Sequence, residues 1–163
     1  MQRFLDNEHD VATRYPSRRT ALLWLSLGGI WLTRAGSSEA SDEAPGYRVI
    51  VHADNRVNGV SREFATNAFL KRVTRWDGGV RLFPVDLPPA SGVRHRFSEA
   101  VLGRSVAAVR KYWQQQIFSG RGLPPPELES EQAVVSYISK NRGGLGYVGP
   151  SIELRGVKVL AIR

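Results

Sequence analysis

The sequence predicts a single α/β domain that is built around a mixed sheet and preceded by a short leader. Three observations lead to this prediction. Segments of β-branched residues alternate with segments of helical periodicity, as in layered domains where strands alternate with helices. The length of 163 residues accommodates one domain of ordinary size but not two independent cores. Hydrophobic residues make up 42% and charged residues 23%, the balance of a folded globular protein.

The expected elements follow from turn formers, helix caps and apolar spacing. Strands are expected where β-branched or aromatic runs are bounded by turn formers, at residues 47–51, 81–86, 145–148 and 157–162. Helices are expected at residues 62–73, 93–102, 105–117 and 130–140, with Ser61 and Ser130 as N-caps. Helical spacing assigns to one core Phe69 or Leu70 together with Val101, Val109, Trp113, Ile117 and Val135.

The N-terminal segment has the composition of an export signal. An apolar run over residues 21–32 follows Arg18 and Arg19 and precedes small polar residues. A membrane-spanning helix needs about 20 apolar residues, so this run is short for a permanent anchor. We therefore expect an export signal over residues 1–40, cleaved near Ala40, then a linker over residues 41–46 and the domain over residues 47–163. The alternative is an uncleaved anchor helix, and both place the domain in the periplasm.

The expected domain is basic. Lys and Arg number 23 against 15 Asp and Glu, which gives a net charge of +8. Residues 1–40 contain five of the basic and four of the acidic residues, so the remaining domain keeps a charge of +7. This charge favours anionic partners such as phosphate, nucleic acid or anionic lipid. The chain has no Cys, which excludes disulfides, thiolate metal sites and a Cys nucleophile.

The junction at Ser91 and Gly92 is the strongest candidate for a binding site. It lies between an expected strand and an expected helix, and a helix start presents unpaired backbone N–H groups and about half a positive charge. Ser91, Gly92 and Val93 would supply a hydroxyl and backbone donors to an oxyanion. Arg94 would add a charged donor, and Arg96 is a candidate for lining the cleft. The structural alternative is that Ser91 only caps the helix and both arginines are solvated.

Four segments of the chain resemble one lobe of the phosphate-type substrate-binding proteins of ABC transporters. They are SREFATNAFLKRVTRWDGG (residues 61–79), RLFPVDLPPASGVRHRF (81–97), AVLGRS (100–105) and GGLGYVG (143–149). The resemblance extends over most of the expected domain and implies a single-lobe sandwich, similar to a periplasmic binding protein, with a mixed sheet. It also implies a non-enzymatic protein that binds phosphate or a similar oxyanion such as sulfate at the Ser-Gly junction, without a cofactor.

The chain departs from this family at several positions of the motif. Ser91 and Gly92 match the family's Ser-Gly-Thr, but Val93 replaces the Thr and lacks its hydroxyl. Leu87 and Pro89 stand where the family often has an Arg and an Asp. Family members of full length close two lobes around the ligand, and this chain has about half their length. The alternative interpretation is therefore an envelope interaction module that kept the fold and lost the ligand, with an envelope protein or a second copy of the chain as partner.

Other classes of function find less support in the sequence. No Gly-x-Ser-x-Gly elbow surrounds Ser91 and no acid partner is indicated for a catalytic His, so no enzyme is expected. The segment that contains Tyr147 lacks the Lys-Ser/Thr of a nucleotide-binding loop; Tyr147 is a candidate for lining a cleft, although inward-facing aromatics are commoner. Basic and aromatic residues within 104–113 would suit a nucleic acid. Export argues against that partner, and a membrane contact is expected only through the leader.

The export prediction is tested by fractionation. Residues 17–23 resemble the twin-arginine export motif, with departures at Ala21 and Leu23. We expect the envelope fraction to contain a species that begins near Ser41, and replacement of Arg18 and Arg19 by Lys to reduce export. Recovery of the full-length chain from the cytoplasm alone would contradict the prediction.

Overall fold

The computed structural model describes residues 46–163, and the predicted export signal and most of the linker lie outside the described residues. The strands are β1 (Arg48–His52), β2 (Gly59–Val60), β3 (Phe83–Pro84), β4 (Gly144–Val148), β5 (Val157–Val159) and β6 (Ala161–Ile162). The helices are α1 (Arg62–Phe69), α2 (Gly92–Phe97), α3 (Val106–Phe118) and α4 (Glu131–Lys140), and a π-helical turn, η1 (Ser98–Leu102), follows α2.

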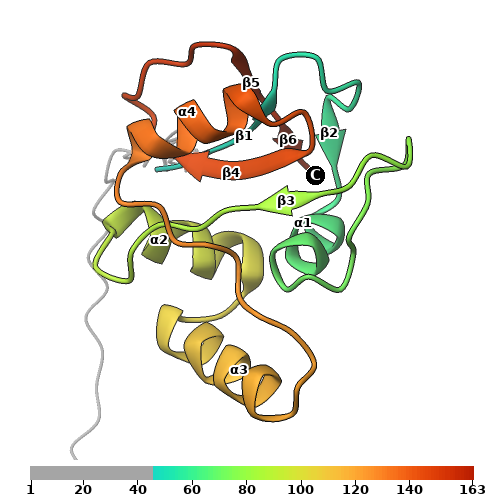
Figure 1. Ribbon diagram of the computed structural model, residues 1–163. Coiled ribbons are helices and arrows are strands. Elements are labelled where there is room, and N and C mark those ends of the chain that lie inside the picture. Colours follow the sequence, from blue (N-terminus) through green and yellow to red (C-terminus); the bar gives the residue numbers. More distant parts are fainter. Residues whose placement is uncertain (1–45) are drawn as a thin grey trace, which may run out of the picture. The chain divides into compact units, whose positions relative to one another are not determined.

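A four-stranded sheet in the order β3-β4-β1-β5 forms the centre of the fold (Figure 1). Strand β1 is antiparallel to both of its neighbours, β4 and β5, whereas β3 is parallel to β4. This arrangement is the mixed sheet that the sequence predicts. Strands β2 and β6 pair in parallel in a separate two-stranded sheet.

Helices α4 and α2 lie on opposite faces of the central sheet (Figure 1). Gly146 of β4 lies against Val134 and Ile138 of α4. The next residue, Tyr147, stacks its ring on that of Phe97 in α2, with the ring centroids 3.9 Å apart. Because consecutive residues of a strand point to opposite faces, these contacts place the two helices on either side of β4.

Gly146 allows α4 to approach β4 closely. A Cβ atom at Gly146 would lie 2.8 Å from Val134 Cγ1 and 3.1 Å from Val85 Cγ2, distances at which the neighbouring side chains would have to move. The glycine is needed for packing rather than for a turn, since Gly146 is paired with Ile50 in the strand register. The glycine-rich segment is thus part of the core.

The main core forms between the sheet and the helices on its two faces. It contains Phe69, Val101 and Val135, as predicted, together with the buried strand residues Val49, Ile50, Val51, Leu145, Tyr147 and Val148. Val109 and Trp113 are buried but lie outside this cluster, and Ile117 is 48% exposed. The prediction of one core that includes Ile117 is therefore wrong.

Helix α3 packs on the molecule through one narrow face. Its buried residues are Val106, Val109 and Trp113, which recur at helical spacing, and the Tyr112 hydroxyl donates to the Leu70 carbonyl oxygen at 3.4 Å. Ile117 lies one turn beyond Trp113, at the end of the helix, where the elements within residues 46–163 leave about half of its side chain uncovered. In Figure 1, α3 lies on the side of α2 that faces away from the sheet.

Two elements are shorter in the structure than the sequence predicts. The helix expected over residues 62–73 stops at Phe69, because Lys71 adopts a left-handed conformation with φ of 54°. The strand expected over residues 81–86 is reduced to β3, because the Asp86 amide turns away from β4 and donates to the Pro126 carbonyl oxygen at 2.9 Å.

The last predicted strand divides between the two sheets. Residues 157–159 pair with β1, and the Leu160 amide donates to the Val49 carbonyl oxygen at 2.8 Å. Ala161 then pairs with Gly59 in the small sheet. A long-range change of partner thus splits one apolar run into β5 and β6.

Trp113→Ala is expected to lower the free energy of unfolding by about 3–5 kcal/mol, because it removes the largest buried side chain of α3. Phe118→Ala on the same helix is the matched control, since Phe118 is 91% exposed, and we expect it to change stability by less than about 0.5 kcal/mol. Urea unfolding followed by circular dichroism measures both. Equal effects of the two substitutions would show that the packing face of α3 is wrongly assigned.

Candidate functional site

Helix α2 begins at the predicted Ser-Gly junction, and Ser91 is its N-cap. The Ser91 backbone is extended (φ −68°, ψ 122°), and its hydroxyl oxygen accepts a hydrogen bond from the Arg94 amide at 3.3 Å. The Ser91 amide donates to the Pro88 carbonyl oxygen at 2.9 Å, which turns the chain into the helix. Helix α2 continues directly into η1, so the helical segment extends to Leu102. Ser91 therefore caps α2, as the structural interpretation of the sequence expects.

Two backbone donors at the start of α2 are unpaired within residues 46–163. The amides of Gly92 and Val93 precede the first intrahelical hydrogen bond, and neither donates to another group of the described residues. Gly92 is exposed, and a Cβ atom at this position would meet only Arg96 Nη1, at 3.5 Å. The Gly92 amide thus lies on an accessible surface. The side chain of Val93, in contrast, is part of the core.

Arg96 places its guanidinium beside the start of α2. It follows Gly92 by four residues, and helical side chains lean toward the N-terminus, so the Arg96 side chain runs back along the first turn. Its Nε donates to the Gly46 carbonyl oxygen at 3.0 Å. Within the described part of the chain, no carboxylate forms an ion pair with Arg96. Its charge is therefore available at the same turn as the unpaired amides.

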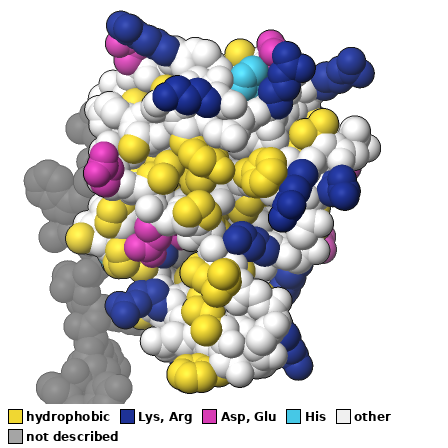
Figure 2. All heavy atoms as spheres, in the orientation of Figure 1, with side chains coloured by type: hydrophobic (Ala, Val, Ile, Leu, Met, Phe, Trp, Pro, Cys, Tyr) yellow, Lys and Arg dark blue, Asp and Glu magenta, His cyan; other side chains and the backbone are white. Residues whose placement is uncertain are grey.

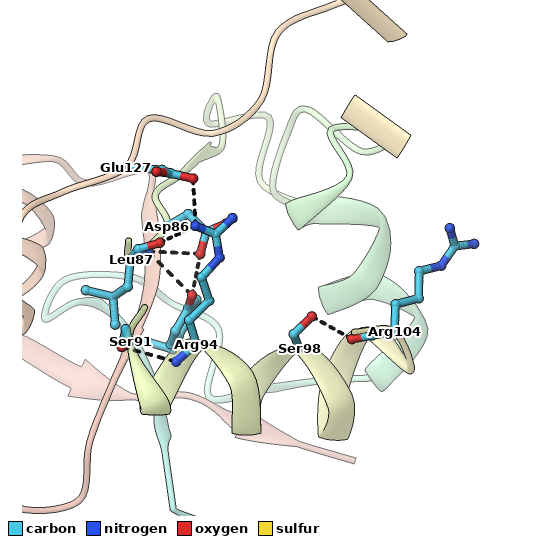
Figure 3. Close-up of polar contacts among 8 residues, drawn as sticks. Asp86, Leu87, Ser91, Arg94, Ser98, Arg104 and Glu127 are labelled. Carbon is cyan, nitrogen blue, oxygen red and sulfur yellow. Dashed lines mark hydrogen bonds and ion pairs between the residues drawn. The ribbon is translucent and has the colours of Figure 1, made fainter. Parts of the chain in front are cut away.

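Arg94 is directed into the protein, not toward the helix start as predicted (Figure 3). It is 5% exposed, and its Nη2 lies 2.9 Å from Asp86 Oδ2. Its Nη1 lies 2.6 Å from Glu127 Oε1 and also donates to the Leu87 carbonyl oxygen. The physical reason is the helical repeat: Arg94 precedes Phe97 by three residues and shares its buried face. These contacts assign Arg94 a structural role.

Asp86 and Tyr147 complete a buried polar network around Arg94. Burial raises the pKa of the Asp86 carboxyl, although the Arg94 charge and hydrogen bonds from Tyr147 and the Leu87 amide oppose the increase. Burial also raises the pKa of the Tyr147 hydroxyl, which keeps its proton and donates it to Asp86. Tyr147 therefore connects β4 to the segment that leads into α2.

Tyr147 does not line an open cleft, although the sequence analysis named it as a candidate for that position. Its side chain is 1% exposed, and its ring packs in a cluster with those of Phe97 and Phe69. The cavity that Tyr147, Asp86 and Arg94 share has a volume of about 10 Å³, comparable to one water molecule. A phosphate ion cannot enter it. Any anion would have to bind on the surface at Gly92, outside this network.

Sequence reasoning missed Asp86 and Glu127 as partners of Arg94. The two acids lie 41 residues apart in the chain; Asp86 stands alone in its turn, and Glu127 is the first of three Glu at alternate positions, so neither points to Arg94. Their segments meet because the Asp86 amide donates to Pro126 and the Leu128 amide donates to the Asp86 carbonyl oxygen. One signal was readable: Arg94 falls at helical spacing with Phe97 and Val101, so its burial and its need for an acidic partner could have been inferred.

The described residues contain neither a metal centre nor a membrane-crossing helix. No cluster of three or more His, Asp or Glu side chains within residues 46–163 is arranged to hold a metal ion. None of the helices in that part of the chain combines the length and the apolarity that crossing a bilayer requires. His52 Nδ1 accepts a hydrogen bond from the Asp54 amide at 3.0 Å, a local turn contact.

Solved structures similar to this chain include phosphate transport proteins. An ABC-type phosphate transport receptor from Vibrio cholerae is 16% identical, with a TM-score of 0.55, and the match covers 72% of this chain and 46% of that one. A Clostridium perfringens protein of the phosphate ABC transporter substrate-binding type, solved with bound phosphate, is 16% identical, with a TM-score of 0.57 and coverage of 72% and 44%. PstS from Borrelia burgdorferi is 12% identical, with a TM-score of 0.54 and coverage of 72% and 47%.

The fold is that of one lobe of a periplasmic binding protein. At these identities the similarity shows the fold alone, and the chain spans less than half the length of the structures that it matches. No protein-family model and no curated protein matches the chain. The single-lobe sandwich with a mixed sheet is therefore confirmed, whereas binding of an anion at Ser91, Gly92, Val93 and Arg94 stays a prediction.

Arg94→Met is expected to destabilise the protein by about 3–5 kcal/mol near neutral pH, because it leaves the Asp86 carboxylate buried without its cationic partner. Removing Arg94 would raise the pKa of Asp86 further above its ordinary value of 3.8. The folded variant would then bind a proton that the unfolded chain releases, so its stability relative to wild type should rise as the pH falls toward that value. Chemical denaturation at several pH values measures the effect.

The double variant Asp86→Asn/Arg94→Met is the matched control for this prediction. It removes the carboxylate charge as well, so we expect it to be more stable than Arg94→Met at neutral pH and to lose the added pH dependence. If both variants have the same stability at every pH, Asp86 does not carry the effect.

Proposed function

We propose that residues 46–163 form a non-enzymatic domain of a protein exported to the periplasm, and that it binds a small inorganic oxyanion, phosphate or sulfate, at the start of α2. The observation that carries this proposal is the group of donors there: the unpaired amides of Gly92 and Val93 with the Arg96 guanidinium beside them. The Ser91 hydroxyl accepts from the Arg94 amide and keeps its own proton to donate.

The chemistry of this group favours an anion over other small ligands. Unpaired N–H groups and the positive end of the helix dipole both attract negative charge. The Arg96 guanidinium would otherwise be unfavourable beside the helix start, because its charge opposes the dipole; a bound anion would relieve this repulsion. Arg96 replaces Arg94 as the proposed charged donor, since Arg94 is engaged by Asp86 and Glu127.

The similar structures support the same class of ligand. Two of them are phosphate transport proteins by description, and one of these was solved with phosphate bound. Gly92 is exposed in the described residues, so an oxyanion bound there would stay in contact with water on one side. Exposed hydrogen bonds contribute little net free energy, and we expect a dissociation constant on the order of 0.1–1 mM.

A second candidate function is an interaction module that kept the fold without the ligand. The observation that favours it is the neutralisation of Arg94: two carboxylates surround the only arginine of α2 that is buried. Val93 also directs its side chain into the core, so only its amide is left for a ligand. Under this alternative the α2 surface would bind no oxyanion.

An NMR titration of the chain with phosphate and with sulfate distinguishes the two functions. We expect amide shifts of Gly92 and Val93 to saturate with millimolar anion. Arg96→Gln should weaken binding by about fivefold, the factor for one exposed charged contact of about 1 kcal/mol, whereas Arg104→Gln, an exposed control, should leave it unchanged. Gly92→Val should block the approach to the backbone.

The result that would overturn the proposal is the absence of shifts at residues 91–94 in tens of millimolar phosphate and sulfate, while the protein stays folded. Shifts of equal size in Arg96→Gln and Gly92→Val would likewise assign the anion to another surface. In either case the interaction module becomes the better interpretation.

A further inference from the structure

The C-terminal end of α3 and the loop that follows it expose three large apolar side chains. Phe118 is 91% exposed, Leu123 is 68% exposed and Ile117 is 48% exposed. They lie within seven consecutive residues, whereas the other large apolar residues exposed in residues 46–163 are Val80 and Phe83, three residues apart, and Val159 of β5. Side chains this accessible contribute nothing to the core. An apolar cluster at the end of an exposed helix commonly marks a contact surface.

The same part of the chain is basic and contains no acid. Residues 103–126 include Arg104, Arg110, Lys111 and Arg121, and neither Asp nor Glu occurs among them. All four cationic residues are exposed, and none of them forms an ion pair with a carboxylate of residues 46–163. Figure 2 shows hydrophobic and basic side chains together over the region that α3 occupies in Figure 1.

The helical repeat aligns these two kinds of side chain. Lys111 and Phe118 are seven residues apart, as are Arg110 and Ile117, so each pair shares one side of the helix. Trp113 and Val109 occupy the buried face, and Phe118 lies on the opposite side, in solvent. A cation and an exposed apolar group therefore face outward along the same helix. We call Arg110, Lys111, Ile117, Phe118, Arg121 and Leu123 the α3 surface.

We propose that the α3 surface binds an anionic lipid bilayer, with Phe118 and Leu123 inserted among the headgroups and the basic residues on the lipid phosphates. Interfacial segments combine Lys and Arg with Phe and Leu in this way, and each cation near an anionic surface adds to the affinity. This contact goes beyond the proposed oxyanion site, which lies on α2. It also differs from the expectation that only the leader reaches a membrane.

Charge favours lipid over the other occupants of such a surface. A second copy of the chain would bring two basic surfaces together, and the whole chain carries +8. A specific protein partner usually requires charges of both signs to fix its orientation, and residues 103–126 offer only one sign. Binding to a planar anionic surface does not require charges of both signs.

Co-sedimentation of the full chain with phosphatidylcholine vesicles, with and without phosphatidylglycerol, tests the proposal. Phe118→Ser/Leu123→Ser should reduce the partition coefficient on anionic vesicles by at least about tenfold, because two apolar anchors are lost. Val80→Ser/Val159→Ser removes two exposed apolar residues elsewhere and should change it by less than about twofold. Every variant carries the same leader, so any contribution of the leader to vesicle binding is the same on both sides of the comparison.

Arg110→Gln/Lys111→Gln provides a second test that does not depend on apolar residues. We expect about fivefold weaker partitioning for each charge removed on anionic vesicles, and no change on phosphatidylcholine alone. Equal partitioning of wild type and both α3 variants would overturn the proposal. A dimer in sedimentation equilibrium that Phe118→Ser/Leu123→Ser dissociates, with vesicle binding unchanged, would also overturn it and would assign the surface to a second copy of the chain.

Discussion

The buried Arg94 guanidinium joins three parts of the chain that are far apart in sequence. It pairs with Asp86 after β3 and with Glu127 before α4, and through Asp86 it is linked to Tyr147 of β4. Removing charges from water is unfavourable, so such a group is stable only when every polar atom has a partner. Within the described residues, no buried side-chain nitrogen or oxygen lacks one. This network therefore fixes the position of α2 on the sheet, and with it every surface that α2 presents.

The same network determines what the helix start has available for a ligand. Because Arg94 is held inside by two carboxylates, its charge does not reach the surface, and the charge at the first turn comes from Arg96 instead. The helix also uses the Ser91 hydroxyl oxygen to cap the Arg94 amide. Two amides, one hydroxyl proton and one guanidinium make a small set of donors on an open surface. The proposed affinity is low for this reason, since no second lobe in the described residues excludes water.

Helix α3 is attached to the domain in a different way from the other helices. The sheet, α1, α2 and α4 share one core, whereas α3 is attached by Val106, Val109 and Trp113 and by the hydroxyl of Tyr112. A helix held along one face leaves its remaining surface free of packing constraints. The exposed charges there are all basic, unlike the mixed charges of an ordinary solvated helix, and they stand beside exposed apolar residues, which is why we assign this surface to a bilayer. The domain thus has two independent surfaces, one on α2 and one on α3.

The sequence by itself predicted the helical segments and the strands of the central sheet in their order, because the signals for them are local, but it did not predict β2. Serine caps at Ser61, Ser91 and Ser130, the apolar spacing of the helices and the β-branched run of β1 depend on neighbouring residues only. Only the tertiary structure decided where Arg94 points, how β5 separates from β6 and why Ile117 is exposed. Each of these depends on a partner brought close by folding, Asp86 and Glu127 for Arg94, and β1 and β2 for the two last strands. For Ile117 the deciding fact is that no element of the described chain covers the end of α3. The sequence shows that a charged residue stands near the start of a helix. The direction in which its side chain points depends on burial, which is a property of the whole fold.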